Sequence, residues 1–274
     1  MDLRIAVAAQ NFGADFQGLV SARLQRLLQP GQSVVERTID RWQDREYVRA
    51  RLLGLLEESP RPVALVGICI RPDAATLAAF RDAGVPVVLV DERAEGASTV
   101  ACDSLAGGYL AGRHLAQSGR RSLAIVSGPA RDYNAMQRVR GVAKALSEAG
   151  LPLPGDQVIE VPRYSREDGA RAMAKVLALH GIDAIACTAG DACAAGLLAA
   201  ARARAVKVPE TLAVVGYDDA PLAASSDPPL TTVRQPLEAI AREVFRLATE
   251  ETAGILLKPR TVLLEPELVV RKSA

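Results

Sequence analysis

Two adjacent carboxylates follow a short apolar run near the middle of the second half of the chain. The run Leu212 to Val215 predicts a buried strand, which leads through Gly216 to Asp218 and Asp219. In an open α/β sheet, ligands bind beyond the carboxyl ends of the strands, so we expect Asp218 to accept hydrogen bonds from a ligand there. Because side chains alternate along a strand, Asp219 should point the other way and cap the following turn. Two catalytic carboxyl groups would have to face each other across a scissile bond, so we predict no catalytic residue here.

Arg138 is a second candidate for binding a ligand. It follows a loop at residues 127–137, near the expected start of a helix. A guanidinium group presents a rigid fork of donors that can hold adjacent hydroxyl groups or a carboxylate. A cation near a helix N-terminus is unfavourable to the helix dipole, which speaks against a purely structural role. A surface ion pair is the alternative.

Three further side chains near these positions could contact a ligand. Tyr164 precedes an expected helix and is one of few aromatic residues, and its ring could stack on a sugar or a base. Packing on the rim of the core is the alternative for Tyr164. Asp132 and Asn134, in the loop before Arg138, offer hydrogen-bond donors and acceptors.

Short apolar runs alternate with longer amphipathic segments along the whole chain, which is the pattern of repeated βα units and of parallel sheets with helices on both faces. The pattern has two similar halves, so we expect two doubly wound lobes. Strands are expected at 5–8, 63–68, 87–90, 123–126, 157–161, 184–187, 212–215, 261–264 and 268–270. Helices are expected at 15–28, 45–58, 72–83, 104–118, 135–149, 165–180, 191–204 and 236–252.

Composition excludes several classes of function. The 274 residues are 49% hydrophobic and carry a formal net charge of +1, so nothing indicates a nucleic-acid-binding surface. The four cysteines stand singly, and with two histidines they predict no metal site. Neither a signal peptide nor an apolar run of about eighteen residues is present, so we expect a cytoplasmic protein without membrane contact. There is no glycine-rich phosphate loop, so we expect neither a cofactor nor a nucleotide-dependent enzyme.

Several blocks of the chain, in order, resemble those of the lactose- and galactose-repressor (LacI/GalR) family. The stretch 212–236, with Val-Gly-Tyr-Asp-Asp and Pro-Pro-Leu-Thr-Thr-Val-Arg-Gln-Pro, is similar almost word for word. Other matching blocks are 88–91, 100–115 with Gly107-Gly108, 119–129, Arg138-x-x-Gly141, Val208-Pro209 and 266–271. The resemblance implies a periplasmic-binding-protein-like (type I) α/β fold of two lobes joined by three crossovers. These crossovers fall near Ala101–Cys102, Thr232–Gln235 and Leu257–Arg260.

With these crossovers, the N-terminal lobe comprises residues 1–101 and 235–257, and the C-terminal lobe comprises 102–234 and 258–274. The resemblance places the ligand between the lobes. It gives Arg138 the role of the family's effector-binding arginine, and it implies contacts from Phe12, Phe16 and Asp91. For Phe12 and Phe16, packing on the core is the alternative.

Gln235, at a predicted crossover, could contact the ligand through its amide. Gly190 stands where sugar-binding members have a ligand-contacting asparagine, so a simple hexose becomes less certain. A sugar acid, a polyol or a nucleobase-like ligand fits as well. Asp191 and Asp103 are interpreted as helix caps.

The resemblance implies that the chain is the effector-sensing and dimerisation domain of a transcriptional regulator. In that reading it forms a homodimer and reaches operator DNA only through a helix-turn-helix headpiece. The expected first strand starts by residue 4, so no headpiece lies within the sequence; whether it was removed or never present is open. The alternative is a solute-binding protein that serves a transporter or receptor, which would need an export signal.

Overall fold

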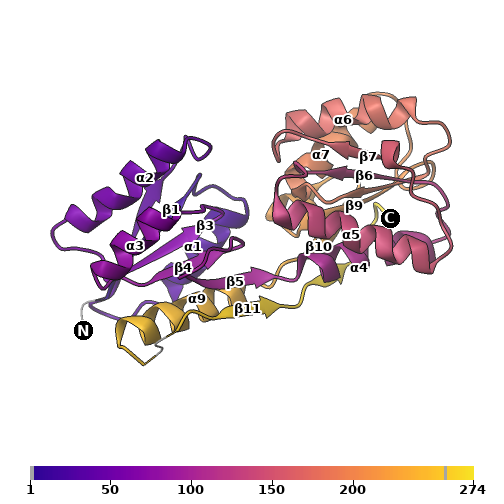
Figure 1. Cartoon of the computed structure of the whole chain (residues 1–274). Coiled ribbons are helices and arrows are strands. Elements are labelled where there is room, and N and C mark those ends of the chain that lie inside the picture. The colour runs from indigo at the N-terminus through magenta and orange to yellow at the C-terminus, as the bar shows by residue number, and fades with distance from the viewer. Residues whose placement is uncertain (1–2, 256–257) are drawn as a thin grey trace. The chain divides into compact units, whose positions relative to one another are not determined.

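The computed structural model describes residues 3–255 and 258–274 and divides the chain into two compact units. The first unit comprises Met1–Cys102 and Pro236–Leu264, and the second comprises Asp103–Gln235 and Glu265–Ala274. The colours of Figure 1 follow the chain as it leaves the first unit, returns to it at α9, and ends in the second.

One segment and two single residues belong to the other unit than expected: Cys102 lies in the first unit and Gln235 in the second. Residues 258–264 were assigned to the C-terminal lobe, but they complete the first unit. The reason is strand pairing: β11 (Thr261–Leu264) lies parallel to β5 (Ser98–Cys102), with Val262 opposite Val100. The third passage between the units therefore comes at residues 264–265, later than expected, while Leu257 of the expected crossover lies outside the described residues.

The first unit is built on a fully parallel sheet of order β11-β5-β4-β3-β1-β2. Its apolar side chains point alternately to two faces. One face packs against α1 and α9, and the other against α2 and α3. The remaining bounds are β1 Arg4–Ala9, α1 Phe16–Arg26, β2 Ser33–Thr38, α2 Arg45–Leu53 with a 3-10 turn at Gly54–Glu57, β3 Ala64–Ile68, α3 Ala74–Asp82, β4 Val87–Val90 and α9 Leu237–Thr252.

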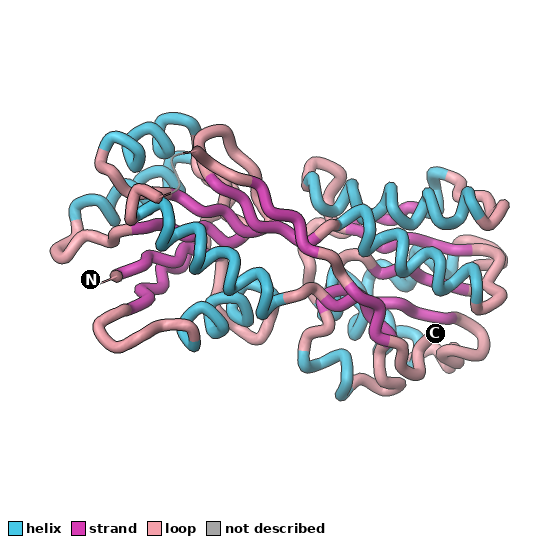
Figure 2. Tube along the Cα trace, turned by 90° about the horizontal axis from the view of Figure 1, so that it is seen from below, coloured by secondary structure: helices cyan, strands magenta, loops and turns pink. Residues whose placement is uncertain are grey.

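The second unit repeats this arrangement with the sheet order β12-β10-β9-β8-β6-β7, in which only β12 is antiparallel among the described strands. Helices α4 and α5 cover one face, and α6 and α7 cover the other. Figure 2 shows the strands of each unit with helices on both sides. The bounds are α4 Ser104–Gln117, β6 Leu123–Ser127, α5 Tyr133–Glu148, a 3-10 turn at Gly155–Gln157, β7 Val158–Glu160, α6 Arg166–Ala178, β8 Ala184–Cys187, α7 Gly190–Arg202, β9 Ala213–Asp218, α8 Pro221–Ser225, β10 Thr231–Arg234 and β12 Glu267–Val269.

Three strands and one short helix were not predicted: β2, β5, β10 and α8. In β5 and β10, serine and threonine occupy buried positions, whereas β2 is a mixed strand without a fully buried residue. Ser98, Thr99, Thr231 and Thr232 are almost fully buried. An apolar-run criterion misses such strands, although threonine suits the pleated surface of a sheet.

Side-chain caps explain where most helices begin. Asp15, Asp44, Asp73, Asp103 and Ser165 each accept a hydrogen bond from a backbone N–H in the first turn of the following helix. The interpretation of Asp103 as a cap is therefore confirmed. None of the described helices is long and apolar enough to cross a membrane.

Candidate ligand site

The carboxyl ends of β8, β9 and β10 bring three predicted residues together at one edge of the second sheet. Asp218, the last residue of β9, accepts a hydrogen bond of 2.7 Å from Nε2 of Gln235. Gly190 stands opposite: a Cβ atom placed on it would lie 2.9 Å from Oδ2 of Asp218. The backbone of Asp218 is left-handed, with φ at 106°. Such strain in a residue other than glycine is concentrated at functional sites.

Arg138 is a buried residue rather than a surface ion-pair partner, with 6% of its surface exposed. Helix α5 begins at Tyr133, earlier than expected, so Arg138 lies in its second turn. Its Nη1 donates to the carbonyl oxygen of Thr188 at 3.1 Å, and its guanidinium carbon lies 3.9 Å from the ring centre of Tyr217. Thr188 precedes Gly190 by two residues, so this bond places the guanidinium group at the edge where Asp218 lies.

Glycines hold Arg138 in this position by letting α4 and α5 touch backbone to backbone. A Cβ atom on Gly108 would lie 1.9 Å from the carbonyl oxygen of Arg138, and one on Gly141 would lie 2.1 Å from that of Leu105. A Cβ atom on Gly107 would collide with the ring of Tyr217, 2.1 Å from its hydroxyl oxygen. The glycines of the Gly-Gly and Arg-x-x-Gly blocks therefore allow the close helix packing that positions Arg138 over the ring of Tyr217.

The arrangement combines a buried cation with a half-buried carboxylate. An aromatic face under a desolvated guanidinium group stabilises the cation by about 2 kcal/mol. Thr188 and Tyr217 were not singled out from the sequence. The signal for Tyr217 was its place directly before Asp218, since alternation turns its ring toward the α4 and α5 face.

Asp191 is not a helix cap, contrary to expectation. Helix α7 begins at Gly190 without a side-chain cap, and Asp191 points into the unit with 1% of its surface exposed. Its carboxylate accepts hydrogen bonds from the backbone N–H of Ala220 at 2.8 Å and from the hydroxyl of Thr232 at 2.6 Å. Burial, followed by the nearby charge of Asp218, raises the pKa of Asp191 well above its usual value.

Asp219 does not cap the following turn either, since α8 has no side-chain cap. Its carboxylate forms ion pairs with Nε of Arg234 and Nη2 of Arg271, both at 2.6 Å. These contacts tie the end of β9 to β10 and to the C-terminal segment. Asp219 therefore stabilises the sheet edge.

Asp132 and Tyr164 lie in the loops that follow β6 and β7, whereas Asn134, expected in the loop, is the second residue of α5. Asp132 caps α5 by accepting a hydrogen bond of 3.2 Å from the backbone N–H of Asn134. The hydroxyl of Tyr164 donates to the other carboxylate oxygen of Asp132. Tyr164 is 42% exposed, and its hydroxyl lies over Gly128, where a Cβ atom would come within 2.2 Å. Tyr164 is thus joined to a loop and is not part of the core.

The three predicted residues of the first unit differ in character. Asp91 follows β4 with a left-handed φ of 57°, and its carboxylate accepts a hydrogen bond of 3.4 Å from the backbone N–H of Cys102. Phe16 is buried in the core with Val20 and Leu24 of its own helix, and the half-buried Phe12 packs against the same cluster. Both phenylalanines thus take part in core packing.

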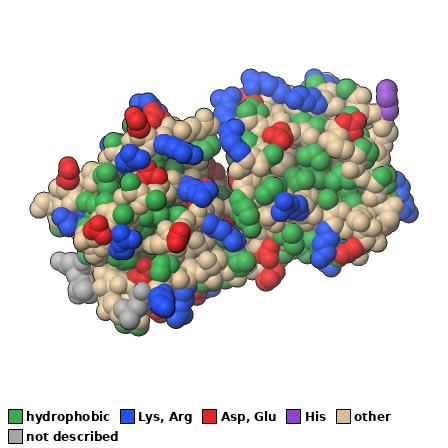
Figure 3. All heavy atoms as spheres, viewed as in Figure 1, with side chains coloured by type: hydrophobic (Ala, Val, Ile, Leu, Met, Phe, Trp, Pro, Cys, Tyr) green, Lys and Arg blue, Asp and Glu red, His purple; other side chains and the backbone are tan. Residues whose placement is uncertain are grey.

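Within the described residues, no group of histidine, cysteine, aspartate and glutamate side chains is arranged to hold a metal ion. On the face shown in Figure 3, both units carry acidic and basic side chains.

Comparison with known proteins gives consistent matches. The family model of the periplasmic binding protein-like domain matches residues 113–274, more than half of the chain. The transcriptional regulator DegA of Bacillus subtilis is 35% identical over 174 residues, which are 64% of this chain and 51% of DegA. The transcriptional repressor PurR of Escherichia fergusonii is 28% identical over 274 residues, covering 97% of this chain and 78% of PurR.

Among solved structures, the complex of the transcriptional regulator CelR with cellobiose has a TM-score of 0.88 and 27% identity, and the match covers 100% of this chain and 85% of that one. The predicted resemblance to LacI/GalR regulators is confirmed. The chain therefore belongs to the periplasmic binding protein-like domain family.

Proposed function

We propose that the chain is the effector-sensing domain of a LacI-type transcriptional regulator and that its effector binds at the carboxyl edge of the second sheet. The observation that carries this proposal is the buried guanidinium group of Arg138, held over Tyr217 and joined through the 188–190 loop to Asp218 and Gln235. A charged side chain that is buried at the carboxyl ends of parallel strands, beside a carboxylate, is a candidate for binding a polar ligand.

The chemistry of these groups selects a polar ligand. Asp218 accepts hydrogen bonds from hydroxyl or amino groups, and Arg138 donates to oxygen atoms that are adjacent or belong to a carboxylate. Gly190 keeps the space beside Asp218 open, because a side chain there would stand within 2.9 Å of its carboxylate. A sugar, a sugar acid, a polyol or a nucleobase-like molecule fits this pattern, and the cellobiose bound by CelR supports a sugar.

The effector acts by shifting an equilibrium between conformations, which it can do only by its differential affinity for them. In the proposed regulator, DNA is contacted by a headpiece outside this chain, and two copies of the chain form a homodimer in the cytoplasm. Light scattering after size exclusion should give twice the mass of one chain, and a single-chain mass would contradict the dimer.

Binding without turnover distinguishes the proposed sensor from an enzyme. Asp219 is engaged by two arginines, and the carboxyl group of Asp191 is buried and bonded to Ala220 and Thr232, so neither faces Asp218 across a ligand as hydrolysis of a glycosidic bond requires. Prolonged incubation should return the ligand unchanged when it is analysed by mass spectrometry. A converted ligand would contradict this part of the proposal.

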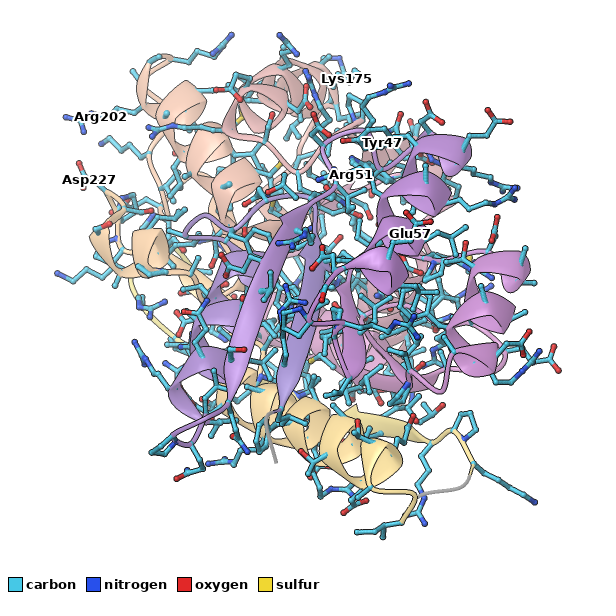
Figure 4. The ribbon with its side chains drawn as sticks, turned by 90° about the vertical axis from the view of Figure 1, so that its left-hand side faces the viewer. Tyr47, Arg51, Glu57, Lys175, Arg202 and Asp227 are labelled. Carbon is cyan, nitrogen blue, oxygen red and sulfur yellow. The ribbon has the colours of Figure 1, made fainter. Side chains whose placement is uncertain are left out.

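A thermal-shift screen against sugars, sugar acids, polyols and nucleobases tests the site. A ligand at about a hundred times its Kd stabilises the protein by about 2.7 kcal/mol, which raises Tm by several degrees. Arg138→Ala and Asp218→Ala should remove the shift. Arg202→Ala and Asp227→Asn are matched controls, because these two side chains form an exposed ion pair of 2.9 Å at the surface (Figure 4). A shift that survives both site variants would refute the site.

A further inference from the structure

A groove of about 400 Å³ lies in the first unit, where α2 and α3 begin. It follows the carboxyl ends of β2, β3 and β4 on the α2 and α3 face of the sheet. None of the ten residues predicted to bind the effector lines it. Its lining includes Trp42, Arg45, Arg71, Leu77, Ala94 and Glu95. The volume lies within the range of sites for small molecules.

Trp42, the only tryptophan of the chain, is held at the groove by an ordered turn although it is 41% exposed. Before it, Ile39 is fully buried, and its backbone N–H donates to Ala9 at 2.8 Å. After it, the N–H of Asp44 donates to the carbonyl oxygen of Arg41 at 2.9 Å, and the Arg41 guanidinium lies 4.9 Å from the ring centre of Tyr47. An indole presented on a braced turn is preorganised to stack on a flat ligand.

The charged side chains that line the groove are of two kinds: Arg49 and Asp73 bond to each other, and the others form no ion pair among the described residues. Arg49 bonds Asp73, which also caps α3, and these bonds lower the pKa of Asp73 to about 2. Arg45 lies one helical turn before Arg49 on the same side of α2. Among the described residues, neither Arg45 nor Arg71 nor Glu95 forms an ion pair.

The position of Arg45 is electrostatically unfavourable for helix α2. It is the first residue of α2, where a cation is unfavourable to the helix dipole. A guanidinium group placed there without a carboxylate partner is suited to an anion from outside the chain. Arg71 adds a second guanidinium group to the same groove.

We propose that this groove binds a nucleoside monophosphate. The base stacks on the indole of Trp42, the phosphate binds between Arg45 and Arg71, and Glu95 accepts a hydrogen bond from a ribose hydroxyl. Bases of any kind stack on an aromatic side chain, and arginine is the preferred partner of phosphate. The groove is lined by none of the residues proposed to bind the effector, and this proposal goes beyond the function proposed above.

The fluorescence of Trp42 provides a direct test, since no other tryptophan contributes to the signal. AMP, GMP, CMP and UMP are titrated into the whole chain, with adenosine and ribose 5-phosphate as ligands that lack the phosphate or the base. We expect saturable quenching by at least one monophosphate and at least about tenfold weaker binding of its nucleoside. Ribose 5-phosphate should quench little, because it has no ring to stack.

Variants locate the binding. Arg45→Ala and Arg71→Ala should each weaken the binding of the monophosphate by about tenfold or more. Arg51→Ala is the matched control, since Arg51 lies on the same helix outside the groove (Figure 4) and should leave the affinity unchanged. Arg138→Ala should also leave it unchanged, so failure of the effector site and failure of this site are distinguishable.

Three results would overturn the proposal. The first is the absence of quenching by all four monophosphates up to about 1 mM, a concentration that corresponds to about −4.1 kcal/mol of binding. The second is equal binding of AMP and adenosine, which would remove the role of the arginines. The third is a loss of affinity in Arg51→Ala as large as in Arg45→Ala, which would mean that only diffuse positive charge attracts the nucleotide.

Discussion

The two units place an aspartate at the same point of the same sheet and use it differently. Their strand orders correspond position by position, so that β4 of the first sheet is the counterpart of β9 of the second. Asp91 follows β4 and Asp218 ends β9, and both have a left-handed backbone, with φ at 57° and 106°. Asp91 accepts a bond from its own sheet, at Cys102, whereas Asp218 is bonded to the side chain of Gln235.

The larger difference lies in the helix that follows the counterpart strands β1 and β6. The sixth residue of α1 is Ser21, and the sixth residue of α5 is Arg138. The residue before the strand-end aspartate is Val90 in the first unit and Tyr217 in the second. At corresponding positions, the first unit therefore has the small hydroxyl group of Ser21 beside an aliphatic core. The second unit has the guanidinium group of Arg138 over the ring of Tyr217.

Helix packing explains how the second unit accommodates the arginine. Helices α4 and α5 touch at Gly108 and Gly141, where any Cβ atom would collide with backbone. In the first unit, α1 packs against α9 through side chains, including the ion pair of 2.9 Å between Arg23 and Glu238. In two units of the same fold, the residues that a site can hold therefore depend on how closely the covering helices approach each other, as well as on the residues at the strand ends.

The largest expected effect comes from breaking that helix contact. Gly108→Ala should destabilise the protein by about 3 kcal/mol, because its Cβ atom would stand 1.9 Å from the carbonyl oxygen of Arg138. Gly54→Ala in the first unit is the control, since nothing lies within 4 Å of the added atom, and it should be neutral or gain up to about 1 kcal/mol. Urea unfolding measures both. Equal stabilities would show that the close approach of α4 and α5 is not needed.

A second prediction compares the two aspartates directly. Asp218→Asn should weaken effector binding by about 1.5–3 kcal/mol, since it removes a charged acceptor of ligand hydrogen bonds. Asp91→Asn should have the smaller effect, because the carboxylate of Asp91 accepts a bond from the backbone of its own sheet. Isothermal titration with a ligand from the screen measures the two affinities. A larger loss in Asp91→Asn would move the principal anchor to the first unit.

The smallest expected effect is a pH dependence that arises at the second site. The raised pKa of Asp191 means that the folded state binds a proton more tightly than the unfolded state does. The stabilisation by this group is complete below its unfolded pKa of about 3.8 and is lost as the pH rises from there toward the folded pKa.

Asp191→Asn should therefore gain stability relative to the parent protein as the pH rises above about 3.8, because asparagine has no proton to lose. Denaturant unfolding at a series of pH values above 3.8 provides the measurement. If the free energies of unfolding of the two proteins changed with pH in the same way, the raised pKa of Asp191 would be contradicted.

Most of the fold could be predicted from the sequence, because apolar runs, helical periodicity and aspartate caps all act locally. The strands β5 and β10 escaped prediction because serine and threonine fill positions that only the neighbouring strands make buried, and β2 escaped because its apolar run is only two residues long and none of its residues is fully buried. The third passage between units was misplaced because pairing of β11 with β5 joins residues that are distant in the chain.

The candidate site was predictable in part. Arg138, Asp218, Gly190 and Gln235 were identified from strand ends and from the family resemblance, and they lie at one edge. The inward orientation of Asp191 and the ion pairs of Asp219 could not be predicted, since both depend on partners far away in the sequence. The indole and the arginines at the first unit's groove lie outside the blocks of sequence that resemble the family, and only the structure brings them together.

Hydrogen exchange of the whole chain, with and without the effector found by the screen, tests the central claim most directly. If the effector binds at the carboxyl edge of the second sheet, peptides that cover residues 127–138, 188–191 and 217–220 will be protected by the ligand. Protection that is confined to peptides of the first unit, or absent from these three segments at saturation, would contradict the assignment of the site.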